Sequence, residues 1–95
     1  MPITFHIPGP LRVYCGGSQR IEITSSPATL REAFEALYRE CPAVRDRLVT
    51  ETGQLREHIN IFVGTENIRF TGEFATPLLP GAEISILPAV SGGGG

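Results

Sequence analysis

One amphipathic segment, residues 29–41, most constrains how this chain can fold. Thr29 and Glu32 form a T-x-x-E capping box at its start, and Pro42 stops the helix because proline cannot continue a helix interior. Between these limits, apolar residues recur at spacings of three and four: Leu30, Ala33, Phe34, Leu37, Tyr38 and Cys41. A helix with one apolar stripe has to pack that stripe against another layer, which the rest of the chain must supply.

The N-terminal segment alternates apolar and polar residues over 3–7 and again over 21–24, the period of a half-buried strand. Gly16 and Gly17 supply a turn between these runs, because glycine adopts positive φ without steric cost. Residues 11–14 resume an extended pattern before that turn. The whole segment is therefore predicted to be a hairpin.

Two further strands are expected after the helix, at residues 58–63 and 83–87. A short edge segment at 68–70 and a loop over 71–83 connect them, and 43–49 favours one more short helical piece. This order predicts an α+β fold of the β-grasp (ubiquitin-like) type. One main helix would cross one face of a mixed sheet of four or five strands, with the last strand central beside the first.

Length, charge and composition exclude several classes of function. The 95 residues suffice for one domain, and the net charge is −2. All eight basic residues are arginines scattered among ten acids, so nothing indicates a nucleic-acid or membrane-surface partner. There is no signal peptide pattern and no apolar run of the ~20 residues that span a bilayer. We expect a soluble protein of the reducing cytoplasm.

The residues that could perform catalysis do not form a recognisable set. His6 and His58 alternate with the apolar face of predicted strands, which favours a solvent- or partner-facing position over a catalytic one. Cys41 is expected to be a small core residue, and for Cys15 the sequence favours neither alternative. No H-x-x-x-H, C-x-x-C or Ser-His-Asp pattern is present. We expect no enzyme, no catalytic residue, no metal and no bound cofactor.

The C-terminal glycine run, Gly92 to Gly95, directly follows the last predicted strand. Pro88 biases Leu87 toward extended geometry, so the chain leaves the sheet extended. Because glycine has no Cβ, such a terminus can enter a narrow tunnel in another protein and present its carboxylate there. The competing interpretation is an appended flexible linker of the same composition.

The sequence ISILPAVSGG at residues 84–93 resembles the C-terminal signature of the MoaD/ThiS family of sulfur carriers. The runs at 59–63, 68–70 and 79–83 resemble that family's central strand, its following turn and its approach to the last strand. The early positions resemble the branch that carries sulfur for cysteine synthesis: Ile7-Pro8, Leu11-Arg12 and Gly16-Gly17.

The resemblance implies a domain over residues 1–90 and a flexible tail over 91–95, with the chemistry at the C-terminal glycine. An E1-like enzyme would adenylate the carboxylate with ATP, and a sulfur donor would displace AMP to leave a thiocarboxylate. A sulfur-acceptor enzyme, either cysteine-synthase-like or the large subunit of a molybdopterin synthase, would then use that sulfur. The small domain would itself be a substrate, or a non-catalytic subunit of a synthase.

The tail is longer than the family pattern, whose second glycine corresponds to Gly93. Three alternatives follow: Gly95 is the activated residue, trimming exposes Gly93, or Gly94 and Gly95 were appended and make this form inactive. Two added residues extend the reach by at most ~7 Å, enough to overshoot a fitted site.

A docking face for partners is expected near the root of the tail. Phe62 projects opposite the apolar face of its strand, and either Phe62 or Phe70 could join Leu87 in an exposed apolar patch. The alternative is that they complete the core under the long loop.

Two rival functions remain: a modifier conjugated to lysines of target proteins, and an interaction module with an inert tail. The absence of lysine excludes polymers linked through lysines of this domain.

Overall fold

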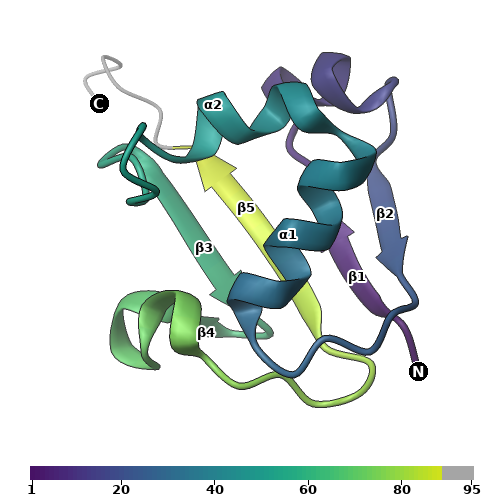
Figure 1. The fold of residues 1–95 in the computed structure, drawn as a ribbon, viewed down its shortest axis with the longest axis vertical. Coiled ribbons are helices and arrows are strands. Elements are labelled where there is room, and N and C mark those ends of the chain that lie inside the picture. The colour runs from purple at the N-terminus through teal and green to yellow at the C-terminus, as the bar shows by residue number, and fades with distance from the viewer. Residues whose placement is uncertain (89–95) are drawn as a thin grey trace.

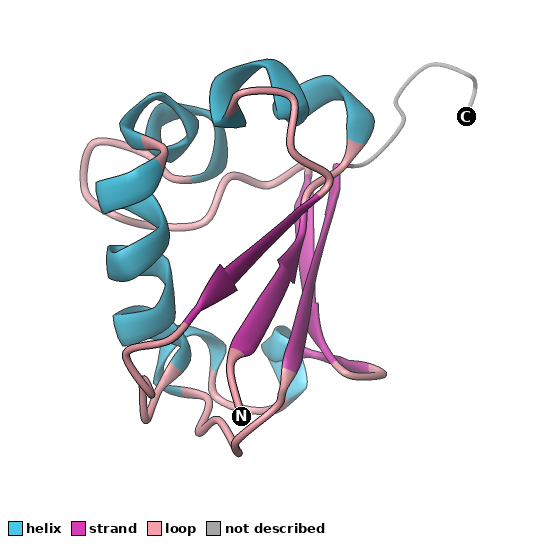
Figure 2. Ribbon diagram, turned by 90° about the vertical axis from the view of Figure 1, so that its right-hand side faces the viewer, coloured by secondary structure: helices cyan, strands magenta, loops and turns pink. Residues whose placement is uncertain are grey.

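The computed structural model describes residues 1–88 of the chain. Its sheet has the strand order β2-β1-β5-β3-β4, in which β1 and β5 are parallel and the other neighbours are antiparallel. The strands are β1 (Ile3–His6), β2 (Arg20–Ile23), β3 (Ile59–Val63), β4 (Glu66–Asn67) and β5 (Glu83–Pro88). Helix α1 (Leu30–Glu40) crosses one face, as Figures 1 and 2 show. The predicted α+β, β-grasp architecture is confirmed.

Helix α1 begins at the predicted capping motif, although Glu32 accepts from the N–H of Ala28 and not from that of the N-cap residue Thr29. The Thr29 hydroxyl oxygen accepts from the Glu32 backbone N–H at 3.4 Å, and the Glu32 carboxylate accepts from the Ala28 N–H at 3.0 Å. The apolar stripe faces the sheet, where Leu30, Ala33 and Leu37 are fully buried. These two hydrogen bonds satisfy one backbone donor in the first turn of the helix and one just before it.

The core lies between α1 and the three central strands. Phe34 is its aromatic centre, with its ring 5.0 Å from that of Phe5 on β1 and 5.6 Å from that of Phe74, both in edge-to-face geometry. Ile61 on β3 and Ile84 on β5 are fully buried against the same helix. Each such side chain contributes about 1.5–3 kcal/mol through removal of apolar area from water.

The connection between β1 and β2 differs from the extended hairpin that the sequence predicts. Residues Gly9–Cys15 form a 3₁₀ helix, η1. Prolines at its start suit helical φ, and the Leu11 N–H donates to the Pro8 carbonyl at 2.9 Å. Leu11 and Cys15 both turn into the core. The glycine pair is therefore no hairpin turn: Gly16, at φ 65°, caps the end of η1.

The rest of the chain follows the prediction with local shifts. The helical piece expected after α1 is confirmed as η2 (Pro42–Val44) and α2 (Arg45–Leu48), with Val44 and Leu48 fully buried. The edge strand is β4, and the 68–70 segment predicted there forms a 3₁₀ turn, η3 (Ile68–Phe70). A further 3₁₀ turn, η4 (Glu73–Ala75), interrupts the predicted loop and places Phe74 against α1.

Candidate functional site: the end of the sheet that carries the tail

Strand β5 brings the chain to one end of the sheet, at Leu87 and Pro88, which we call the tail root. The strand is held on both sides, by β1 in parallel and by β3 in antiparallel register, with Ile59 opposite Pro88. The tail residues Gly92, Gly93, Gly94 and Gly95 lie outside the described residues, as does the predicted domain boundary at residues 90–91. The structure therefore defines Pro88 as the point after which the C-terminal residues follow.

The elements around the tail root follow from the strand directions. Because β1 is parallel to β5, its C-terminal end leads into η1 at the same end of the sheet, and the antiparallel β3 begins there. Helix α2 and the 49–58 loop complete this end (Figure 1). The loop is held by an Arg56 Nε–H that donates to the Asp46 carbonyl at 2.8 Å and by a bridge between Val49 and Leu55.

The sheet face opposite α1 carries two of the predicted docking residues. Leu87 is 49% exposed and pairs with Asn60, while Phe62 is half-buried and pairs with Ser85. Phe62 and Leu87 are therefore diagonal neighbours on one face, a separation of roughly 7–8 Å in such a register. They form an apolar pair beside the tail root.

Phe70, the third predicted docking residue, lies elsewhere. It is 84% exposed, so it does not complete the core, but it belongs to η3, which follows β4. Strand β4 pairs with the C-terminal residues of β3, and the tail root pairs with the N-terminal residue of β3. The length of β3 thus separates Phe70 from Leu87.

The two histidines do not converge on a catalytic arrangement. His6 Nε2 lies 2.6 Å from Glu83 Oε1 on the open sheet face, with its side chain 37% exposed, which confirms the solvent- or partner-facing prediction. His58 is exposed and precedes β3 instead of lying in it. Among residues 1–88, no three His, Cys, Asp or Glu side chains are grouped so that they could hold a metal ion.

Both cysteines are free and buried. Cys41 is 5% exposed, as predicted for a core residue, and Cys15 is 7% exposed in the same core. Burial, with a smaller contribution from the neighbouring Cys41 thiol, raises the pKa of Cys15 to about 12. Since the thiolate is the nucleophile, Cys15 is unreactive at neutral pH and is no candidate for carrying sulfur on its own side chain.

A hollow of about 790 Å³ lies between α1, the 52–57 loop and the η3–η4 segment. Its lining includes Arg31, Arg69 and Phe74 but no histidine or cysteine. It therefore contains no Cys-His or Ser-His pair. No helix within residues 1–88 has the length and apolarity that crossing a bilayer requires.

Comparison with known proteins places this geometry in a family. The ThiS family model matches residues 5–93, which include Gly92 and Gly93. The sulfur carrier protein CysO of Mycobacterium tuberculosis is 35% identical over 95 residues, covering 98% of this chain and 100% of that protein. A putative sulfur carrier protein of Archaeoglobus fulgidus is 29% identical over 73 residues, 77% of this chain and 83% of that protein.

Comparison with solved structures leads to the same family. The M. tuberculosis CysO crystal structure superposes with a TM-score of 0.83 at 33% identity, covering 93% of this chain and 99% of that chain. In a BexX/CysO complex from Amycolatopsis orientalis, the matching chain superposes with a TM-score of 0.86 at 33% identity, covering 95% of this chain and 98% of that chain. This chain therefore belongs to the ThiS family, as a ubiquitin-like sulfur carrier of the CysO branch that acts as a carrier and not as a catalyst.

Proposed function

We propose that this protein carries sulfur as a thiocarboxylate on its C-terminal glycine and delivers it to an acceptor enzyme of cysteine synthesis. The observation that carries the proposal is the position of β5. This central strand, held on both sides, projects the glycine tail from one end of a domain whose described residues offer no reactive thiol. The match to the ThiS family through residue 93 supports the same chemistry.

The reaction needs two partners, because a carboxylate is a poor acyl donor at neutral pH. An E1-like enzyme would use ATP: a carboxylate oxygen attacks the α-phosphate, pyrophosphate leaves, and an acyl adenylate forms. A sulfur nucleophile then attacks the carbonyl carbon and AMP departs, which leaves the thiocarboxylate. The acceptor enzyme would use that sulfur to attack its electrophilic substrate. The carrier contributes position and reach, and its partners contribute the catalytic groups.

Reach decides which glycine reacts. Gly93 lies five residues beyond Pro88 and Gly95 seven, so the extended tail spans at most ~18 Å or ~25 Å from the tail root. Because the family match ends at Gly93, we propose Gly93 as the activated residue after trimming, and Gly95 only if the partner's tunnel is correspondingly longer.

The apolar pair formed by Phe62 and Leu87 is the proposed docking face for both partners. It lies on the open side of the sheet beside the tail root, and apolar anchors of this kind carry most of the energy of an interface. The complex of a CysO with BexX shows that a relative binds a partner protein. We propose the cytoplasm as the site of action, where free cysteines such as Cys15 and Cys41 remain reduced.

Intact-mass measurement tests the proposal. Full-length protein and a form ending at Gly93 would be incubated with ATP, sulfide and an E1-like adenylating enzyme, with a form ending at Ser91 as the matched control. We expect one oxygen to be replaced by sulfur in the form ending at Gly93, and none in the form ending at Ser91. Absence of exchange in both longer forms would overturn the proposal.

A second function, protein modification, is favoured by one observation. The structure of SAMP1 from Haloferax volcanii, a small archaeal modifier protein, superposes with a TM-score of 0.80 at 25% identity, covering 97% of this chain and 99% of that chain. The chain would then be attached to target lysines through the same tail. Adducts bearing a glycine remnant on lysine, found in cells that express the protein, would support this function, and their absence alongside a thiocarboxylate would exclude it. A third possibility is that the protein is the small subunit of a molybdopterin synthase. The acceptor enzyme that consumes the thiocarboxylate distinguishes this role from cysteine synthesis.

A further inference from the structure

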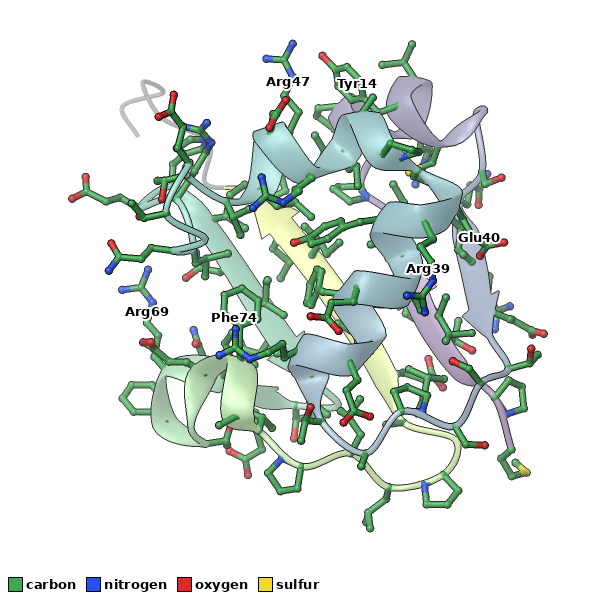
Figure 3. All side chains as sticks on the ribbon, in the orientation of Figure 1. Tyr14, Arg39, Glu40, Arg47, Arg69 and Phe74 are labelled. Carbon is green, nitrogen blue, oxygen red and sulfur yellow. The ribbon has the colours of Figure 1, made fainter. Side chains whose placement is uncertain are left out.

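The end of the molecule that carries the tail root also carries a partly exposed group of residues with no part in the function described so far. It consists of Arg12, Val13 and Tyr14 of η1 and Arg47 of α2, and we call it the η1–α2 patch. The guanidinium carbon of Arg47 lies 4.8 Å from the centroid of the Tyr14 ring, and Figure 3 shows the pair side by side at one end of the molecule. Val13 is 75% exposed, although it is an apolar residue.

Both arginines of the patch are held in place without a carboxylate partner among residues 1–88. The Arg12 Nε–H donates to the Ile7 carbonyl at 2.9 Å, which leaves the terminal nitrogens of its guanidinium for another acceptor. The Arg47 guanidinium is stacked on an aromatic ring, a contact that leaves its N–H edges outward. By contrast, the adjacent Arg45 lies 4.0 Å from the Asp46 carboxylate. Neighbouring elements η1 and α2 therefore supply two guanidinium groups and one exposed valine, residue types suited to carboxylates and to an apolar contact on a partner.

The reach of the tail determines which surface of the carrier a partner must cover. A carboxyl group on Gly93 or Gly95 can lie no more than ~18–25 Å from Pro88, so an enzyme that receives it must approach the end of the sheet where β5 finishes. The parallel pairing of β1 with β5 brings η1 to that same end. A standard interface covers about 800 Å² on each protein, which is wide enough to extend from the tail root across α2 to η1.

We propose that the η1–α2 patch is a second docking surface for the adenylating enzyme, separate from the Phe62 and Leu87 pair on the open face. The enzyme would meet the patch with carboxylates for Arg12 and Arg47 and with an apolar side chain over Val13. A protein surface suits the patch better than a polyanion, because a protein can offer carboxylates together with an apolar side chain for Val13, and the net charge of −2 on the chain disfavours a polyanion. This inference rests on the proposed adenylation of the tail.

The test uses ATP–pyrophosphate exchange with the adenylating enzyme that supports sulfur exchange in the wild type. We expect Arg47→Glu to raise the KM for the carrier about tenfold or more, with kcat unchanged, and Arg47→Lys to retain part of the affinity. The matched control is Arg31→Glu, because Arg31 also lies over an aromatic ring, 5.8 Å from the centroid of Phe74, but at the start of α1 and outside the η1–α2 patch. The KM of this control should equal that of the wild type.

A second variant, Val13→Ser, guards against misfolding, since this exposed side chain contributes little to stability; its KM should also rise. If Arg47→Glu and Val13→Ser keep the wild-type KM while the wild type is adenylated, the patch proposal is overturned and the proposed function stands. The patch proposal is also overturned if the two substitutions weaken binding to the acceptor enzyme but leave the KM for the adenylating enzyme unchanged. If the wild type itself is not adenylated, the proposed function fails and the patch proposal fails with it.

Discussion

The two faces of the sheet differ in role: the face covered by α1 provides most of the stability, and the open face carries the proposed docking residues. The face under α1 is continuous and dry, with Phe5, Phe34 and Ile61 no more than 2% exposed. The opposite face carries the hydrogen-bonded His6–Glu83 pair and the exposed Leu87. Strand β5 belongs to both, because Ile84 and Ile86 point under the helix while Leu87 points out. If the carrier docks in turn on the two enzymes proposed above, it can present the open face without weakening the covered one.

The largest effect is expected from a substitution on the covered face. Phe34→Ala should lower the free energy of unfolding by about 3–5 kcal/mol, because it removes the ring that contacts Phe5 and Phe74 and leaves a cavity. Chemical denaturation measures this loss. Docking of the fraction that remains folded should not change. A loss below about 1 kcal/mol would show that the covered face is not the main source of stability.

High pH should also weaken the covered face, progressively as the pH rises. The folded-state pKa of Cys15 is raised from 9.0 to about 12 by burial and then by Cys41, and burial raises that of Tyr38 from 10.0 to about 12. Both acids thus hold their protons more tightly in the folded state, so stability is intact below pH 9 and falls as pH rises from about 9 to 12. Denaturation midpoints across this window would show the slope. Cys15→Ala should make it shallower, whereas an unchanged slope would assign the effect to other groups.

On the open face, Leu87→Ala should separate binding from stability. We expect affinity for the adenylating enzyme to fall by about 1–2 kcal/mol, because an apolar anchor beside the tail root is lost. The free energy of unfolding should change by less, since half of the side chain is already in water. Leu79→Ala is the matched control, because Leu79 is 79% exposed in the loop that precedes β5, at the other end of that strand. Equal losses of affinity in the two variants would remove Leu87 from the docking face.

The covered face could largely be predicted from the sequence, because its signals are local. The capping box and apolar stripe locate α1, and strict alternation identifies β3 and β5 with their inward residues. Residues 9–15 were harder, because prolines permit either an extended chain or a helical turn, and Leu11 and Cys15, four residues apart, share a face in both. What distinguishes the helix is the exposure of Val13, which a strand would place on the same face as Leu11, and the sequence alone does not show that exposure.

The recognition surfaces depend on how distant segments meet, which a pattern along the chain does not contain. The shift of the edge strand from residues 68–70 to Glu66–Asn67 places Phe70 on η3, away from Leu87. The pairing of Tyr14 with Arg47 joins η1 to α2 across more than thirty residues of sequence. Single residues such as Phe62 could be recognised as facing outward, but their grouping required the sheet register.

The smallest effect tests whether the polar half of the open face contributes to stability. Glu83→Gln removes the carboxylate that lies 2.6 Å from His6 Nε2, with side chains 37% and 61% exposed. Even a fully charged exposed pair contributes only about 0–1 kcal/mol, so we expect a change near the lower end of that range. A double-mutant cycle with His6→Gln isolates the coupling between the two side chains. A coupling energy above about 1 kcal/mol would mean that the open face also holds the sheet together, and the division between the two faces would fail at β1 and β5, where this pair joins them.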